Sequence, residues 1–142
     1  MNKKLLSIML VIIVSITLIG VTALVVVMKF IGEDGEEKAP SIEEVVAASV
    51  DIPEITTNLS SGNIVRLSFK IETESKKAME ELTQREFQVR DIIISELANT
   101  TSDQLDGKDG MDKFKEQIKN KINELMQEGK VNKIYTTSYI LQ

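Results

Sequence analysis

The chain has 142 residues, with 22 acidic and 17 basic side chains and neither histidine nor cysteine. This composition excludes disulfides, thiolate nucleophiles and metal sites with nitrogen or sulfur ligands, and it removes the usual general base at neutral pH. The length allows one modest domain and an accessory segment.

The accessory segment comes first, because no charged residue lies between Lys4 and Lys29. The 24 residues between them, 5–28, are rich in Leu, Ile and Val. As a helix they would reach roughly 36 Å, enough for a hydrocarbon core of about 30 Å. A signal-peptide core is shorter and ends at a small-residue cleavage site, which this run lacks. We therefore predict an uncleaved transmembrane helix over residues 5–28, after a cytoplasmic tail of residues 1–4.

Charge on the two sides of this run predicts its orientation. Lys3 and Lys4 precede it, whereas all 22 acidic and 14 of the 17 basic residues follow Lys29, which gives the outer part a net charge of −8. Lysines in a short flank keep that flank in the cytoplasm, so the C-terminal part is predicted to be extracytoplasmic. Its acidity argues against nucleic acid or anionic lipid as a partner. The run has no ionisable residue, so we expect an anchor that conducts no ions.

Residues 29–49 are predicted to be a linker that includes a possible short helix. The stretch "IGEDGEEKAP" combines two glycines, a proline and several acids. Ten flexible residues span about 16–19 Å, so the domain is expected to stay near the membrane. After it, "SIEE" fits a capping box between Ser41 and Glu44. Val45, Val46 and Val50 favour a strand equally, and both options stay open.

Residues 50–142 are predicted to form the extracytoplasmic domain, beginning with two strands. In "NIVRLSFKIETE", from 63 to 74, apolar and polar residues alternate, which is typical of a strand with one buried face. The preceding "LSSGN" supplies turn residues. Before that turn, "VDIPEITTNL" indicates a partner strand, and Pro53 places it at an edge of the sheet.

Two helices and a last strand complete the domain. The first helix is expected over about 76–98 and the second over about 110–128, with Asp109 capping its start and Gly129 ending it in the left-handed conformation. The last strand covers 131–141. We expect one of its faces to carry Tyr135, Thr137, Tyr139 and Leu141, and the other Ile134 and Ile140. The order β-β-α-α-β predicts an α+β domain.

Candidate chemical sites are few. The carboxylate pairs Glu43–Glu44 and Glu80–Glu81 lie in polar helical surroundings, so we predict solvated faces rather than acid–base sites. The stretch "DGKDGMD", 106–112, suggests a calcium loop, but neither glycine register supplies the final bidentate glutamate. A loop between helices is the better interpretation. We therefore predict no catalytic residue, no cofactor and no metal.

Arg90 and Asp91, side by side on the first helix, form the most conspicuous polar pair. A structural role is the favoured interpretation, because an arginine fork can join several elements and buried polar groups are usually satisfied locally. Arg90 would bond a carboxylate or a strand-end carbonyl, and Asp91 would brace the loop before Leu105. The alternative is a direct contact with a partner.

Several stretches together resemble a known family. They are "TTNLSSGNIVRLSFKIE", which contains Asn58 and Leu59; "VRDIIISELANTTSDQL", which contains Arg90, Asp91 and Leu105; and the closing "IYTTSYILQ", which ends at Gln142. In this order, after a basic tail, one span and an acidic linker, they resemble the FliL family of flagellar basal-body-associated bacterial membrane proteins. The resemblance covers nearly the whole chain.

This resemblance implies a non-catalytic role in the flagellar motor. It implies an outer domain similar to the stomatin/prohibitin (SPFH) domain, assembly into homo-oligomeric rings, and association with the ion-driven stator units. The protein would brace a stator so that it generates torque, which supports motility and swarming. Asn58, Leu105, Arg90 and Asp91 then become structural or partner-contact candidates.

Two other classes remain as alternatives. A membrane-anchored scaffold or cell-division protein would need apolar heptads that continue from the span, whereas the sequence turns to loop and strand. An extracytoplasmic hydrolase using carboxylates is disfavoured by the missing histidine and by only six Phe and Tyr residues without tryptophan.

Overall fold

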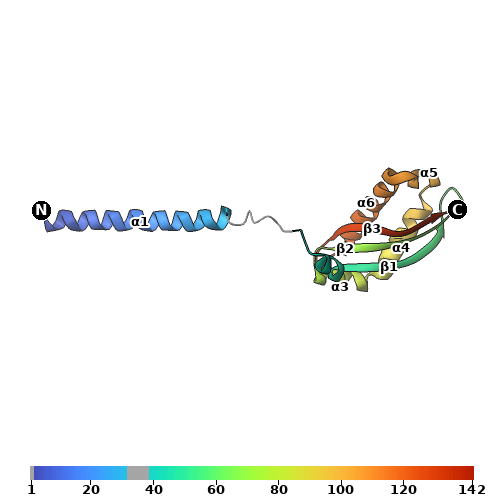
Figure 1. The fold of residues 1–142 in the computed structure, drawn as a ribbon, viewed down its shortest axis with the longest axis horizontal. Helices are drawn as coiled ribbons and strands as arrows, with labels where there is room; N and C mark the ends of the chain where they lie inside the picture. Colours follow the sequence, from blue (N-terminus) through green and yellow to red (C-terminus); the bar gives the residue numbers. More distant parts are fainter. Residues whose placement is uncertain (1, 32–38) are drawn as a thin grey trace. The chain divides into compact units, whose positions relative to one another are not determined.

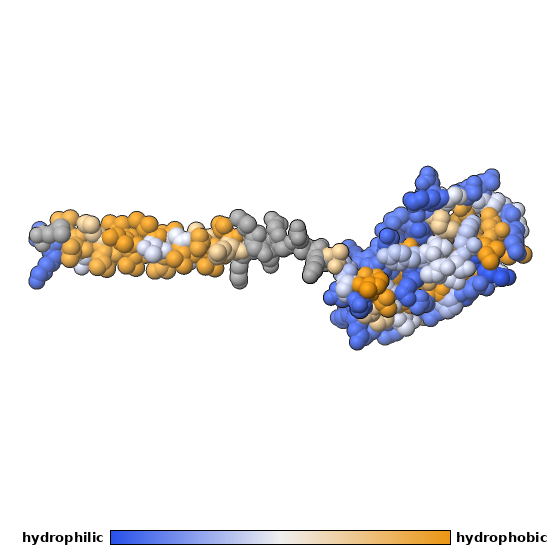
Figure 2. Space-filling model, viewed as in Figure 1, coloured by the Kyte–Doolittle hydropathy of each residue, from blue (hydrophilic) through white to orange (hydrophobic). Residues whose placement is uncertain are grey.

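The computed structural model describes residues 2–31 and 39–142, which belong to an N-terminal helix and a compact domain that begins at Pro40 (Figure 1). The helix, α1, runs over Lys3–Ile31, which extends the predicted span by two residues at its start and three at its end, so Lys29–Ile31 are helical rather than linker. The segment Lys3–Met28 is long and apolar enough to cross a membrane, with a mean hydropathy of 3.0, and none of it is buried against the rest of the protein. Figure 2 shows their almost continuous hydrophobic surface. Residues 32–38 of the predicted linker lie outside the described residues.

The few hydroxyl side chains of α1 bond to the helix itself. Ser15, Thr17 and Thr22 each donate to the carbonyl four residues earlier, over 2.7–2.8 Å. Their polar groups are therefore satisfied without a neighbouring helix, which is the condition for a lone helix in a hydrocarbon environment.

The domain is built on a three-stranded antiparallel sheet in the order β1-β2-β3: β1 Ser49–Asn58, β2 Ile64–Thr73 and β3 Val131–Leu141. The turn between β1 and β2 contains Gly62 at φ +88°, a conformation that favours glycine. β1 is an edge strand, as Pro53 predicted, and its register with β2 shifts between Ile52 and Ile55, around the proline.

Helices cover one face of this sheet and leave the other open (Figure 1). They are α3 Lys76–Gln84, α4 Glu86–Ala98, α5 Ser102–Leu105 and α6 Gly107–Leu125; a short helix, α2 Ile42–Ala47, precedes β1. α3 and α4 contact β1, whereas α6 contacts β3. Between the helices and the sheet lies one apolar core, whose fully buried members include Phe69, Ile52, Leu67, Ile71, Leu82, Ile93, Leu97, Leu105, Ile118 and Ile122.

The open choice at residues 41–50 is settled by a capping box. The Ser41 hydroxyl accepts from the Glu44 N–H, and the Glu44 carboxylate accepts from the Ser41 N–H. Since both free amides are satisfied, α2 begins there, and the strand starts only at Ser49.

The single helix predicted over 76–98 is wrong, because the chain breaks at Arg85. This residue has φ −91° and ψ 9°, and it joins α3 to α4. The apolar stripe is interrupted there: of the six residues between Leu82 and Val89 only Phe87 is apolar, and it is 71% exposed. The break turns each helix so that its own buried residues meet the core.

Both predicted ends of the second helix are also wrong. α6 begins at Gly107, so most of "DGKDGMD" is helix rather than loop, and Asp109 lies in the first turn, whereas Asp106 occupies the cap position without a side-chain bond. α6 ends at Leu125. Gly129 does have a positive φ, +119°, but in the following loop, where a Cβ atom would lie 2.7 Å from the Glu74 carboxylate.

The predicted faces of the last strand are wrong because β3 is irregular. Its register with β2 shifts by one residue between Ser68 and Phe69, which pair with Ser138 and Thr136. The extra residue, Thr137, exchanges the two faces. Ile134 therefore lies on the helix-covered face and is buried, whereas Ile140, opposite Arg66, is exposed on the open face.

Candidate interaction site

The most conspicuous polar contact of α4 joins it to the irregular part of β1. Val89, Ile93 and Leu97 of α4 are fully buried. Beside them, the Arg90 guanidinium donates from Nη1 to the carbonyl oxygen of Pro53 over 3.3 Å. The partner is a carbonyl in the interior of β1, rather than the carboxylate or strand-end carbonyl expected for Arg90, and the bond joins α4 to the register shift of β1.

Asp91 points to a different surface. It lines a groove of about 760 Å³ between α4 and the end of α6, together with Phe87, Gln88, Ile92, Lys121, Glu124 and Leu125. Phe87 is 71% exposed at this groove, which is unusual for a large aromatic side chain. Asp91 therefore does not brace the corner before Leu105, contrary to expectation.

The corner between α4 and α6 is held by other groups. Thr101 and Gln104 form a second capping box, which starts α5. The corner is also tied to the β1–β2 turn, because the Ser102 N–H donates to the Ser61 hydroxyl over 3.0 Å and the Ser60 N–H donates to the Thr100 carbonyl over 3.0 Å.

Leu105 and Asn58 have different surroundings. Leu105 is 1% exposed and belongs to the core beneath the corner, so its placement is that of a packing residue. Asn58 is the last residue of β1, opposite Ile64, and its side chain is exposed. Whether either residue contacts a partner stays a prediction.

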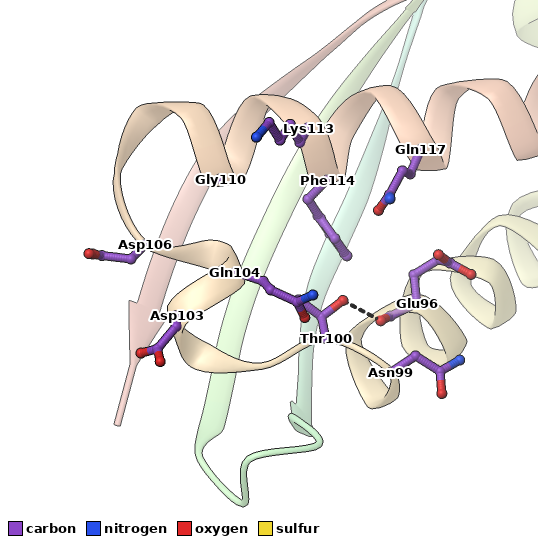
Figure 3. Close-up of a pocket in the computed structure, with 10 residues that line it drawn as sticks. All are labelled: Glu96, Asn99, Thr100, Asp103, Gln104, Asp106, Gly110, Lys113, Phe114 and Gln117. Carbon is purple, nitrogen blue, oxygen red and sulfur yellow. Dashed lines mark hydrogen bonds between the residues drawn. The ribbon is translucent and has the colours of Figure 1, made fainter.

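A pocket of about 560 Å³ opens beside this corner (Figure 3). The Thr100 hydroxyl donates to the Glu96 carbonyl over 2.6 Å, and Phe114 points from α6 into the space between the helices. A Cβ atom on Gly110 would lie 2.5 Å from the Gln104 carbonyl oxygen, so glycine permits the close approach of α5 and α6. The lining residues are Glu96, Asn99, Thr100, Asp103, Gln104, Asp106, Gly110, Lys113, Phe114 and Gln117.

The pocket is lined mainly by acidic and other polar side chains. Its charged residues are three acids and one lysine, and the chain has no histidine or cysteine. Within residues 2–31 and 39–142, no group of three or more acidic side chains is arranged to hold a metal ion. Burial raises the pKa of nearby Tyr139, and the charge of Asp106 adds to this effect, so the phenol stays protonated at neutral pH. The pocket can recognise polar groups through its carboxylates, its amides and Lys113.

One structural carboxylate was missed by the sequence prediction. Glu81, predicted to lie on a solvated face, is only 12% exposed and accepts hydrogen bonds from the Gln127 N–H, the Glu128 N–H and the Arg85 Nε. It thereby joins α3 to the loop that leads into β3. Arg85, four residues after Glu81, could have predicted the ion pair between them, because side chains at this spacing meet on a helix. No residue near Glu81 in the sequence predicted its bonds to the loop.

Comparisons with known proteins agree on one family. The family of the flagellar basal body-associated protein FliL matches residues 49–142. The chain is 56% identical to the flagellar protein FliL of Bacillus subtilis over 106 residues, which is 75% of this chain and 76% of that protein. It is 27% identical to the flagellar protein FliL of Aquifex aeolicus over 77 residues, which is 54% of this chain and 48% of that protein.

Proposed function

Because the chain belongs to the FliL family of flagellar basal body-associated proteins, we propose that it associates with the stator units of the flagellar motor and supports torque, motility and swarming without catalysing a reaction. The family match carries the flagellar role. The stator as partner is suggested by the combination of a membrane-spanning type of helix with a domain that presents contact surfaces.

We also propose the orientation and the fold relationship expected from the sequence. Lys3 and Lys4 would keep the N-terminus in the cytoplasm, so the domain from Pro40 onward would be extracytoplasmic. Its likeness to the SPFH domain is part of the same proposal. A cysteine placed on the exposed turn, Ser60→Cys, tests the orientation, because the chain has no cysteine of its own. Labelling in intact cells by a membrane-impermeant maleimide supports it, and labelling only after lysis contradicts it.

Assembly into a homo-oligomeric ring is a further part of the proposal, and the α4–α6 groove is the surface that supports it. A protruding aromatic side chain beside a partly apolar groove on the same chain is suited to a head-to-tail contact between identical copies. Phe87 is the protruding residue, and Ile92 and Leu125 supply the apolar part of the groove. Arg90 would hold α4 in position for this contact.

The ring is tested by the mass of the full chain in detergent micelles. Phe87→Asp is expected to shift the assembly to smaller species in light scattering, whereas Ile64→Asp, at an exposed isoleucine on the end of β2, is the matched control. An unchanged mass of the Phe87 variant would show that assembly uses another surface.

The motor role is tested in a deletion strain. We expect a smaller swimming zone in soft agar, a larger defect on firmer agar, and restoration by the wild-type gene. Cysteine-pair crosslinking between residues 41–50 and the stator would identify the partner directly. Full motility and full stator retention under every load would contradict the proposal.

A further inference from the structure

β3 is the second edge of the sheet, and a groove of about 590 Å³ separates part of it from α6. On one side lie Lys108, Met111, Asp112 and Lys115 of α6, and on the other lie residues 133–136 of β3. The groove is therefore bounded by a helix and by the free edge of a strand. This is the arrangement in which extended peptides add to a sheet in several recognition domains.

The backbone in this groove directs hydrogen-bonding groups outward. Ile64 and Gln142 exchange both backbone bonds, each over 2.9 Å, so alternate residues of β2 bond to β3. Lys70 is one of these alternate residues of β2, and it pairs with Tyr135, so the N–H and C=O groups of Tyr135 point toward β2. Its neighbours Ile134 and Thr136 consequently direct their N–H and C=O groups away from β2.

The start of β3 shows how such outward groups are satisfied where a partner is available. The Asn123 side chain of α6 accepts from the Val131 N–H over 2.7 Å and donates to the Val131 carbonyl over 3.3 Å. One amide thus takes the place of a neighbouring strand. Three residues later Ile134 is only 4% exposed and Thr136 is half-buried, so a bound segment would reach their outward groups only from within the groove.

A side chain in the same groove also lacks a partner. The hydroxyl oxygen of Thr136 is buried, yet no group of the described residues bonds to it. Buried hydroxyls are normally hydrogen-bonded, and an unpaired one in a groove points to a ligand that supplies the bond. This observation is independent of the strand edge.

The charge of the groove differs from that of the domain around it. From Pro40 onward the chain has 18 acidic and 13 basic residues. The groove has three lysines, Lys108, Lys115 and Lys133, and a single acid, Asp112. Asp112 is bonded to two of the lysines, over 2.7 Å and 3.0 Å, and Lys133 lies 5.0 Å from the centroid of the Tyr135 ring. The groove is a local positive region on an acidic domain, so it selects acidic partners.

We propose that the groove between β3 and α6 binds an extended acidic segment of another protein, which adds to β3 as a fourth strand. Its backbone would bond to Ile134 and Thr136, and its carboxylates would lie near the lysines. A second copy of β3 does not fit this description, because residues 131–141 contain one lysine and no acid. The proposal does not depend on the motor role.

A blocked eight-residue peptide of alternating valine and glutamate, with a fluorescent label, tests the proposal on the full chain in detergent micelles. Such a peptide is about 27 Å long as a strand, a length comparable to the open part of β3. We expect saturable binding by fluorescence anisotropy and none for a valine–lysine peptide of the same length. Lys108→Glu with Lys133→Glu should weaken binding roughly a hundred-fold, or about ten-fold for each contact of about 1.4 kcal/mol lost.

Lys113→Glu is the matched control, because Lys113 is exposed on another face of α6 and should leave binding unchanged. Thermal unfolding verifies that each variant is folded. Hydrogen exchange at the amides of Ile134 and Thr136 should slow when the peptide saturates the groove. Equal binding of both peptides, an unaffected double variant, unchanged exchange at these amides, or occupation of the edge by a second copy would each overturn the proposal.

Discussion

The two edges of the sheet are closed to different degrees. On β1, Pro53 has no N–H to offer, the register shifts beside it, and the carbonyl of Pro53 is taken by Arg90. On β3, Asn123 bonds the backbone of the first residue, Val131, and further along the strand the outward groups face the groove beside α6. An exposed edge invites another strand, and proteins usually block it with prolines, bulges or charges.

This difference agrees with the two contact surfaces proposed above. The edge near α4 is closed by its own backbone and one arginine, so α4 is free to present Phe87 and the α4–α6 groove. The edge near α6 keeps its strand available and surrounds it with lysines. If both proposals hold, one sheet supports two kinds of contact, one through side chains and the other through backbone.

The largest loss of stability is expected at a residue of the central strand that lies opposite both edge strands. Phe69 of β2 is 1% exposed and lies opposite Ile52 of β1 and Thr136 of β3. Phe69→Ala should lower the free energy of unfolding by about 3–5 kcal/mol, because it removes a large buried ring and leaves a cavity. Denaturant unfolding of the full chain measures this. A loss below about 1 kcal/mol would mean that the core repacks around the site.

A smaller effect is expected where α6 closes the start of β3. Asn123→Ala removes both bonds to Val131, a residue that is only 3% exposed, and should cost about 1–3 kcal/mol. Hydrogen exchange at the Val131 amide should become faster, which extends the open edge. Asn120→Ala, exposed on the same helix, should change neither quantity. Equal behaviour of the two variants would show that Asn123 does not close the edge.

The corresponding change on the other edge is expected to be weaker. Arg90→Ala removes one partly exposed bond to Pro53 and should cost about 1 kcal/mol. Arg90→Lys keeps the charge but not the fork and should have an intermediate melting temperature. If the alanine variant keeps stability and assembly but loses stator binding, Arg90 is a direct contact instead.

The smallest change in stability is expected at acidic pH, and it concerns the contact of Glu81 with the loop before β3. Burial disfavours the charge of Glu81, but the bonds from the Glu128 N–H, the Arg85 side chain and the Gln127 N–H outweigh it and lower its pKa below the ordinary 4.5. Since the unfolded state then binds the proton more tightly, this contribution to stability is present above the ordinary pKa and is lost as the pH falls through the lowered value.

The unfolding free energy, measured between about pH 7 and pH 3, therefore decreases toward acid. Glu81→Gln should be less stable at neutral pH and should show a shallower decrease. Glu80→Gln, at the exposed neighbour, should follow the wild type. A slope that Glu81→Gln leaves intact would assign the acid sensitivity to other carboxylates.

The sequence predicted the strands well because their signals are local. The alternation of Val65, Leu67, Phe69 and Ile71 and the edge role of Pro53 are both confirmed. The capping box at Ser41 indicated the start of α2, although the valines after it kept a strand possible.

The sequence predictions were wrong where contacts between distant parts of the chain determine the local structure. The break at Arg85 follows from how two helices meet one core, and the bulge at Thr137 follows from pairing with β2. Glu81 receives its amide bonds from a loop more than forty residues away. The unpaired hydroxyl of Thr136 exists only in the folded domain. Periodicity along the chain contains no information on such contacts.

The hydroxyl groups of α1 have one more consequence. Since Ser15, Thr17 and Thr22 donate their hydrogens to the helix that carries them, they add no directional polarity toward the lipid or toward a companion segment. We therefore expect the helix to act as an anchor through its length and hydrophobicity. An unrelated apolar segment of equal length, substituted for it in a chimaera, should tether the domain equally well, so the specificity of the protein is encoded almost entirely downstream of residue 39.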